Sequence, residues 1–185
     1  FTVAGGVARA ESEQGVVVEL YTSQGCSSCP PADELMGQLA DMPGVIGLAL
    51  HVDYWDYIGW SDTFANPRFT ARQKAYAQAA GDRMIYTPQI IVDGGKRVEG
   101  NRPGEVAQAI AASGKQAGSV DLDLSRKNGQ LVIHAESAGA IPAGTSVQLV
   151  RYKDQAQVEI GRGENAGLTM QYHNIVTSWQ RIGEW

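Results

Sequence analysis

Residues Val16–Asp33 read VVVELYTSQGCSSCPPAD and contain a short apolar run followed by the only two cysteines of the chain. The run 16–21 is nearly continuous and rich in β-branched residues, which is typical of a strand buried on both faces. Cys26 and Cys29 follow it with two serines between them, and an amphipathic stretch at 32–40 comes next. A Cys-x-x-Cys between a strand and a helix favours thiol–disulfide chemistry.

The residues after the cysteines predict a βαβ unit. Leu35, Met36 and Leu39 share one helical face, and Pro43-Gly44 ends the helix. Residues 45–52 form a second run typical of a buried strand, and a crossover of this length joins parallel strands. Proline at position 30 disfavours a helical conformation at Cys29. We therefore expect a tight turn at the cysteines, with the regular helix starting at Pro30 or Pro31.

The remaining predicted elements belong to two domains that meet at about residue 117. A helix is predicted with Asn66 as its N-cap, Pro67 at its first position and Gly81 beyond its end. Strands at 89–92 and 97–99 with a turn at 93–95, and a helix at 103–113, complete an α/β domain over 15–116. Alternating residues and the turn Asn128-Gly129 predict an antiparallel β domain over 117–185. Its strands are expected at 120–124, 131–135, 146–152, 156–160 and 168–176.

The amino-acid composition and the net charge exclude some classes of function. A chain of 185 residues with 43% hydrophobic residues can bury a substantial core. The net charge of −5, without a block of lysines and arginines, argues against nucleic-acid binding. No apolar run approaches the ~20 residues of a membrane-spanning helix, so we expect no stable membrane insertion.

The first residues indicate export. Residues 1–14 are interpreted as a leader or the remnant of a signal peptide, because Ala8-Arg9-Ala10 has the A-x-A form of a signal-peptidase site. A flexible leader without that role is the alternative. Export would place the protein outside the cytoplasm, in an oxidising compartment where a pair of cysteines persists as a disulfide.

The two cysteines receive different predicted roles. A thiolate at a helix N-terminus is stabilised by unpaired amide groups and the helix dipole. Cys26, the first and the more exposed of such a pair, is the predicted nucleophile, and Cys29 is the predicted resolving thiol. A structural disulfide is one alternative. A zinc site is a weaker one, because it needs two of the scattered residues His51, His134 and His173.

Two further residues are predicted to serve the dithiol. Thr87-Pro88 precedes an apolar strand, and in this context we expect a cis bond packed beside the cysteines, although a trans proline is commoner in general. The residue before it would offer its backbone to an extended substrate. Glu19 either points under the cysteines, where it could shuttle the proton of Cys29, or points outward to solvent.

An aromatic stretch at 54–60 could form a substrate groove. Asp53, Trp55, Asp56 and Trp60 are the predicted substrate-binding residues, and burial in the core is the alternative for the aromatic ones. Residues 162–167 form either a loop with a role or a plain hairpin turn.

The order of elements over residues 15–113 resembles the thioredoxin superfamily. More specifically, residues 18–33 together with His51-Val52-Asp53-Tyr54-Trp55-Asp56, Tyr86-Thr87-Pro88-Gln89 and Arg162-Gly163-Glu164-Asn165 look like the bacterial secreted family labelled domain of unknown function 1223. The resemblance implies a thioredoxin-like domain, with a central mixed sheet flanked by helices and a helical insertion, followed by a small antiparallel β domain. By the superfamily analogy Cys26 and Cys29 are the active dithiol and Pro88 is the cis proline. Gly25 departs from that pattern, which has an aromatic residue before the first cysteine.

These observations predict an exported thiol–disulfide oxidoreductase that acts on a protein or small-molecule thiol or disulfide partner and uses no cofactor or metal. The first alternative is a Cu(I)-handling protein whose ligands are Cys26, Cys29 and His51, because soft sulfur ligands suit that ion. The second is a non-catalytic partner-binding module with a structural disulfide. The direction of electron flow depends on the reduction potential, which the two serines do not reveal.

Overall fold

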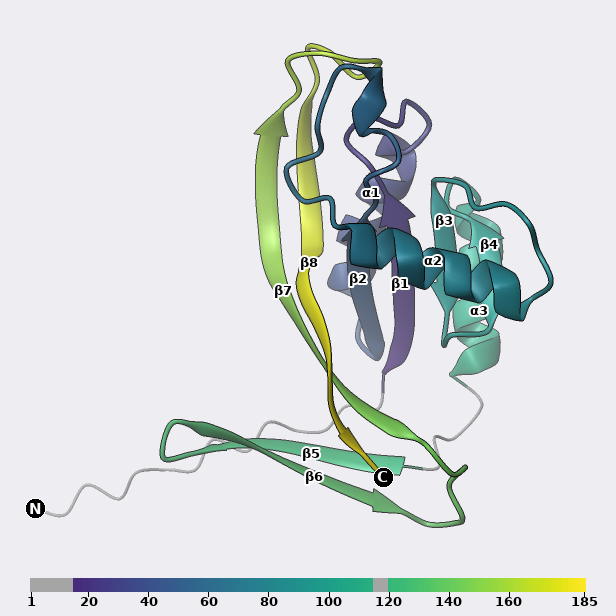
Figure 1. The fold of residues 1–185 in the computed structure, drawn as a ribbon, viewed down its shortest axis with the longest axis vertical. Helices are drawn as coiled ribbons and strands as arrows, with labels where there is room; N and C mark the ends of the chain where they lie inside the picture. Colours follow the sequence, from purple (N-terminus) through teal and green to yellow (C-terminus); the bar gives the residue numbers. More distant parts are fainter. Residues whose placement is uncertain (1–14, 115–119) are drawn as a thin grey trace, which may run out of the picture.

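The structure, a computed structural model, describes residues 15–114 and 120–185 (Figure 1). Up to residue 113 the chain contains both strands and helices, and from residue 120 the described elements are all strands. The elements are β1 (Val16–Thr22), α1 (Pro30–Ala40), β2 (Val45–His51), the 3₁₀ turn η1 (Asp56–Ile58), α2 (Pro67–Ala79), β3 (Gln89–Val92), β4 (Lys96–Glu99), α3 (Pro103–Ser113), β5 (Val120–Lys127), β6 (Gln130–Ser137), β7 (Ser146–Glu159) and β8 (Thr169–Glu184).

A mixed sheet of six strands, in the order β4-β3-β1-β2-β8-β7, forms the centre of the described chain. The predicted βαβ unit is confirmed, because β1 and β2 pair in parallel from Val16↔Val45 to Thr22↔His51. β3 pairs antiparallel with β1, and β4 pairs antiparallel with β3. The ends of β1 and β2 that carry Thr22 and His51 therefore lie next to the cysteines.

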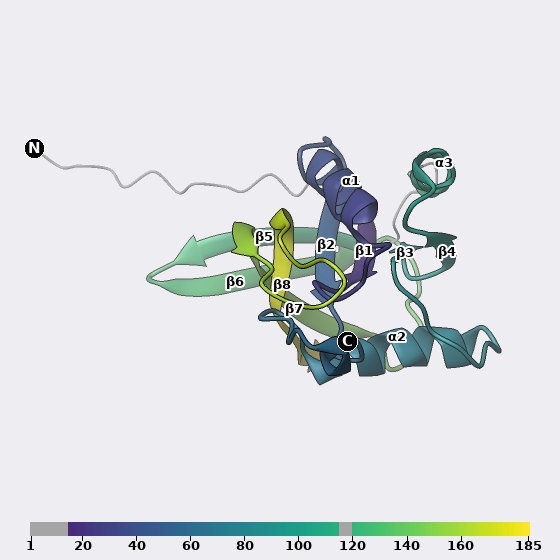
Figure 2. The ribbon, with the colours of Figure 1, turned by 90° about the horizontal axis from the view of Figure 1, so that it is seen from above.

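Helices cover both faces of this sheet, with α1 and α3 on one side and α2 on the other (Figure 2). Alternation along β1 gives each face its own core. Val18 and Leu20 pack with Met36 of α1 and Val106 of α3, whereas Tyr21 packs with Phe69 of α2. The predicted cap of α2 is confirmed, because Asn66 Oδ1 accepts the Arg68 N–H at 3.0 Å.

The strands after residue 145 differ from the sequence prediction. Instead of several short strands in a sheet of their own, β7 and β8 are two long strands that join the central sheet, where β8 pairs in parallel with β2 at Ala49↔Ile175. The polar stretch Lys153-Asp154-Gln155, which we expected to separate two strands, lies within β7. Charged residues are usual there, because β7 is the solvent-facing edge of the sheet.

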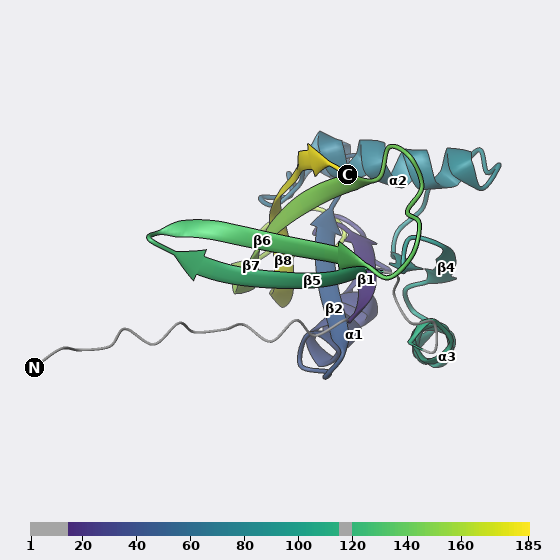
Figure 3. The ribbon, with the colours of Figure 1, turned by 90° about the horizontal axis from the view of Figure 1, so that it is seen from below.

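β5 and β6 form a separate two-stranded antiparallel sheet that projects beside the lower end of the β7–β8 ribbon (Figures 1 and 3). Asn128 and Gly129 both have positive φ, of 52° and 78°, as the predicted type I′ turn requires. A mixed α/β fold with a separate small antiparallel sheet is thus confirmed, but that sheet lies between α3 and β7 in the sequence rather than after the fold. The leader at 1–14 and the residues at the proposed boundary, 115–119, lie outside the described residues, and the boundary at 117 stays a prediction. None of the described helices is long and apolar enough to cross a bilayer.

Candidate dithiol site

Cys26 and Cys29 form a disulfide at the N-terminus of α1, with their Cα atoms 5.4 Å apart. Two successive turns build the loop, because Cys26 N–H donates to Ser23 O at 3.1 Å and Cys29 N–H donates to Cys26 O at 3.2 Å. The helix starts at Pro30, as predicted. Cys29 nevertheless has helical angles, φ −81° and ψ −31°, so the expected effect of Pro30 on its conformation was wrong.

The predicted difference in exposure between the two cysteines is wrong. Both are 0% exposed, whereas Ser27 and Ser28 between them are exposed. The side chains in contact with Cys26 Sγ are Ser28, within the Cys-x-x-Cys motif, and Thr87, which lies 61 residues further along the sequence.

Thr87 brings a hydroxyl group to Cys26. The Thr87-Pro88 bond is cis, as predicted, and Thr87 Oγ1 donates to Cys26 Sγ at 3.2 Å. Trp55 Nε1–H donates to the same Oγ1 at 2.7 Å. Because indole N–H can only donate, this bond leaves the hydroxyl proton of Thr87 for the sulfur. Ser28 Oγ lies 3.4 Å from Cys26 Sγ as a second hydroxyl contact.

Replacing Thr87 by valine should make reduced Cys26 less reactive. A hydrogen bond to a charged group contributes about 1.5–3 kcal/mol, and this one stabilises the thiolate over the thiol. We expect the alkylation rate of Cys26 at neutral pH to fall about tenfold or more, measured in a Cys29→Ser background. Thr177→Val, which removes a hydroxyl that donates to Arg151 O at 3.1 Å, is the matched control and should leave the rate unchanged. An unchanged rate in Thr87→Val would show that the hydroxyl does not act on the sulfur.

Trp55 also explains the glycine before the first cysteine. A Cβ added to Gly25 would lie 3.2 Å from Trp55 Cβ and 3.4 Å from Ile58 Cδ1. The segment between β2 and α2 thus occupies the space that a side chain at position 25 would need. Of the four predicted substrate-binding residues, Trp55 is the one bonded to Thr87.

Trp60 also lies at the site. Its Nε1–H donates to Gln24 Oε1 at 2.8 Å, two residues before Cys26. The two carboxylates of the predicted groove are used elsewhere. Asp53 Oδ1 accepts the hydroxyl of Thr70 on α2 at 2.5 Å, and Asp56 accepts from Asp62 N and Ser61 Oγ within its own segment.

Glu19 is buried, but its carboxylate belongs to a network that reaches α2. Arg72 donates to both of its oxygens at 2.8 Å, and the hydroxyls of Tyr21 and Tyr76 donate at 2.8 Å. Burial, together with the charge of Glu19, raises the pKa of Tyr21, which keeps that hydroxyl protonated. Glu19 is therefore buried rather than solvent-facing, and its carboxylate is held by Arg72 and two tyrosines instead of being free to shuttle a proton.

Asp33 is a buried carboxyl group of α1 with Thr22 and His51 near it. It lies one turn after Cys29 on α1, with its N–H donating to Cys29 O at 3.1 Å, and it is 3% exposed. Within the described residues neither of its carboxylate oxygens has a hydrogen-bond partner, and the same holds for Thr22 Oγ1 and His51 Nε2. Burial raises the pKa of Asp33 to about 7, although the nearby His51 and Thr22 lower it in part.

His51 is directed to Asp62 rather than to the sulfurs. Its Nδ1 lies 2.7 Å from Asp62 Oδ2, and its ring contacts Phe64 and Tyr172 edge-on. Over the described ranges, no three His, Cys, Asp or Glu side chains converge in a metal-binding group. Cys26, Cys29 and His51 thus do not converge as three ligands in the described residues, and Cu(I) binding by the two cysteines alone stays a prediction.

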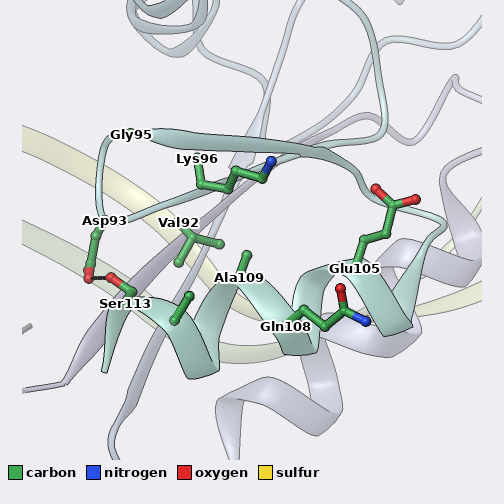
Figure 4. Close-up of a pocket in the computed structure, with 9 residues that line it drawn as sticks. Val92, Asp93, Gly95, Lys96, Glu105, Gln108, Ala109 and Ser113 are labelled. Carbon is green, nitrogen blue, oxygen red and sulfur yellow. Dashed lines mark hydrogen bonds between the residues drawn. The ribbon is translucent and has the colours of Figure 1, made fainter. Parts of the chain in front are cut away.

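A hollow of about 580 Å³ lies away from the cysteines, between α3 and the β3–β4 hairpin (Figure 4). Lys96 and Glu105 lie along it, and Asp93 and Ser113 close one end. Asp93 Oδ1 accepts the N–H of Val17 at 2.8 Å, which places this hollow at the start of β1, whereas the cysteines follow its end. None of the predicted site residues lines it.

Gln24, Asp33, Asp62 and Asn165 join the site without having been predicted as functional. Asp33 left a readable signal, because a carboxylate four residues after Cys29 and three before Met36 falls on the buried stripe of α1. For Asn165 the sequence signal was weaker, namely its place in the loop 162–167. Gln24 and Asp62 had no signal in the sequence, because their importance depends on contacts with each other across 38 residues.

The fold and the site together define a mixed α/β protein with a buried Cys-x-x-Cys disulfide at a helix N-terminus. The chain belongs to the DUF1223 family, described as proteins of unknown function, whose model matches residues 17–185. It is similar to the crystal structure of protein AGR_C_4864 from Agrobacterium tumefaciens, with 32% sequence identity and a TM-score of 0.80. That similarity covers 95% of this chain and 76% of the Agrobacterium chain. Among curated proteins no match to the chain is found.

Proposed function

We propose that this protein is an exported, thioredoxin-like thiol–disulfide exchange protein in which Cys26 attacks and Cys29 resolves. The observation that carries the proposal is the Thr87 hydroxyl, which donates to Cys26 Sγ at 3.2 Å immediately before the cis proline. Such a donor matters most when the sulfur is a thiolate, since hydrogen bonds to ionised acceptors are the stronger ones. The parallel β1-α1-β2 unit followed by the antiparallel pair β3–β4 and α3 supports the thioredoxin-like assignment.

The exchange proceeds through a mixed disulfide. The Cys26 thiolate attacks one sulfur of a partner disulfide, and the displaced partner thiolate takes a proton from solvent. Cys29 then gives its proton to Asp33 and attacks Cys26 Sγ, so that the Cys26–Cys29 bond forms and the second partner thiolate leaves. Two electrons pass to the partner. The reverse sequence oxidises a partner dithiol, and the reduction potential decides the direction.

Asp33 takes the proton role that the sequence suggested for Glu19. A general base works best when its pKa lies near the working pH, and the pKa of Asp33 is about 7. Its carboxylate is free of hydrogen bonds in the described residues, whereas that of Glu19 is held by Arg72 and two tyrosines.

Trapping with Cys29→Ser tests the exchange. This variant keeps the attacking thiol and removes the resolving one, so a mixed disulfide with the partner should accumulate and can be identified by mass spectrometry. Cys26→Ser is the matched control and should capture nothing, because it removes the sulfur to which the Thr87 hydroxyl donates. If Cys29→Ser captures nothing and its Cys26 resists alkylation, the exchange mechanism is refuted.

One observation favours a second function, a partner-binding module with a structural disulfide. Both cysteines are 0% exposed, as expected of a bond that only stabilises the fold. The reduction potential separates the two. An exchanger should lie between about −120 and −270 mV, and a structural disulfide below about −300 mV.

Export and the partner class also belong to the proposal. A Cys-x-x-Cys disulfide is expected outside the cytoplasm, where oxidising conditions maintain it. The partner is a protein or a small molecule that carries a thiol or disulfide. Intact-mass measurement of the protein from its native host would test export, and a retained leader would contradict it.

A further inference from the structure

Asn165, in the loop between β7 and β8, binds directly to the loop that carries the cysteines. It is 5% exposed, and its Nδ2 donates to Gln24 O at 2.9 Å and to Cys26 O at 3.0 Å. These bonds join residues 141 and 139 positions apart in the sequence. The two N–H groups of one side-chain amide thus hold the main chain on both sides of Gly25.

The loop 161–167, here called the clamp loop, is folded so that it presents this amide. Gly167 N–H donates to Ile160 O at 2.7 Å, which closes the base of the loop. Ala166 N–H donates to Gly163 O at 3.2 Å, and Gly163 has a φ of +79°, which glycine adopts without strain. The clamp loop is therefore a defined turn with a fixed direction for residue 165.

Trp60 packs between the clamp loop and residues 23–29, here called the dithiol loop. A Cβ added to Gly163 would lie 3.3 Å from Trp60 Cβ, and one added to Gly161 would lie 3.4 Å from Trp60 Cζ3. On its other side Trp60 bonds to Gln24 Oε1, and the N–H of Gln24 donates to Asp62 Oδ2 at 2.7 Å. Three segments thus meet at Gln24, two residues before the attacking cysteine.

The bonds from Asn165 fix the backbone of Cys26, whose sulfur contacts Thr87 and Ser28, and this arrangement has a chemical consequence. Exchange needs an incoming sulfur to reach Cys26 Sγ, and Cys26 is fully buried while its neighbours Ser27 and Ser28 are exposed. The bonds from Asn165 are neutral amide–carbonyl bonds, each with a modest net free energy. The clamp loop can therefore release the dithiol loop without unfolding the sheet beneath it.

We propose that the clamp loop gates the dithiol, and that Asn165 is a positioning residue that keeps Cys26 in a closed, slowly reacting arrangement until the loop is displaced. This inference rests on the proposed exchange function and adds its regulation. The role of the C-terminal strands is then to carry the gate to the active cysteine.

The test is the rate at which dithiothreitol reduces the Cys26–Cys29 disulfide in the folded, full chain. Asn165→Ala removes both bonds and should raise that rate about tenfold to a hundredfold, as expected for two neutral hydrogen bonds. Trp60→Phe keeps the aromatic packing, loses the bond to Gln24, and should raise the rate by a smaller factor.

Asn174→Gly is the matched control. Asn174 also lies in this C-terminal region and donates its side-chain amide to a backbone carbonyl, Gly47 O, at 2.9 Å. Glycine suits its φ of +47°. This variant should leave the reduction rate within about twofold, although it also loses an amide hydrogen bond. Equal acceleration in all three variants would reduce Asn165 to a structural role, and no acceleration in Asn165→Ala and Trp60→Phe would overturn the gate.

Failure of the gate and failure of the exchange function give different results. Reduction by dithiothreitol needs no physiological partner. Faster reduction in Asn165→Ala, together with an empty trap and an alkylation-resistant Cys26 in the double variant Cys29→Ser with Asn165→Ala, supports the gate and refutes exchange. A trapped partner with an unchanged reduction rate supports exchange and refutes the gate.

Discussion

Replacing Arg72 by methionine should lower the free energy of unfolding by about 3 kcal/mol. Its partner Glu19 is 2% exposed and would keep its charge with only the Tyr21 and Tyr76 hydroxyls as donors. Removing one member of a buried ion pair costs about 3–5 kcal/mol. We expect the lower end because the Arg72 side chain is itself 27% exposed. The loss also includes packing, since the guanidinium lies 3.7 Å from the ring centroid of Trp179.

Chemical denaturation measures this loss of unfolding free energy, and two further variants serve as comparisons. Arg102→Met breaks the ion pairs of Arg102 with Glu99 and Glu105, which are half-exposed, and should leave the unfolding free energy nearly unchanged, because solvent screens such pairs. The double variant Arg72→Met with Glu19→Gln removes the unpaired charge and should recover part of the loss. If Arg72→Met were no more damaging than Arg102→Met, the network at Glu19 would not hold α2 to the sheet.

Replacing Asp33 by asparagine should stabilise the protein above pH 7 and remove part of its pH dependence. The pKa of Asp33 rises from 3.8 to about 7 on folding because the carboxylate is buried. The folded state therefore holds this proton over a pH range where the unfolded state has released it. The contribution of Asp33 to stability is full below about pH 4, falls as the pH rises to about 7, and stays lost above that. A rise of this size corresponds to about 4 kcal/mol.

Unfolding measured from pH 4 to pH 9 tests this expectation. Asp33→Asn, which stays neutral throughout, should lose this decline and should be the more stable form at pH 8 by up to about 4 kcal/mol. Asp41→Asn, an exposed position just after the same helix, should follow the wild-type curve. Asp33→Asn should also resolve mixed disulfides more slowly near pH 7, because Cys29 then lacks its base. A wild-type curve without a decline between pH 4 and pH 7 would contradict the role of Asp33.

The parts of the site that short-range patterns encode were predictable. The cysteines, the helix start at Pro30 and the cis bond before Pro88 follow from spacing and from proline chemistry within a few residues. Burial of Glu19 was one of two options that strand alternation allowed. Its partner was not predictable, because Arg72 lies 53 residues away and nothing near either residue indicates the other.

Contacts between distant segments account for the rest. β8 pairs with β2 through Ala49↔Ile175, and the alternating pattern of β8 does not specify which strand it pairs with. Trp55, Trp60 and Asn165 reach Thr87, Gln24 and the backbone of Cys26 from two segments outside the Cys-x-x-Cys motif. The sequence therefore predicted the pair of cysteines and missed its burial and these contacts.

The parallel pairing of β8 with β2 has a consequence for the solubility of the chain. β2 reads VIGLALH, and its last five residues are buried. Without β8 its outer edge would offer free backbone groups on an apolar strand, a template on which other chains could assemble. The β7–β8 ribbon covers this edge of β2, so that the outermost strand of the sheet is the charged strand β7. The ribbon whose loop carries Asn165 to the cysteine loop is thus also the one that protects the molecule from self-association.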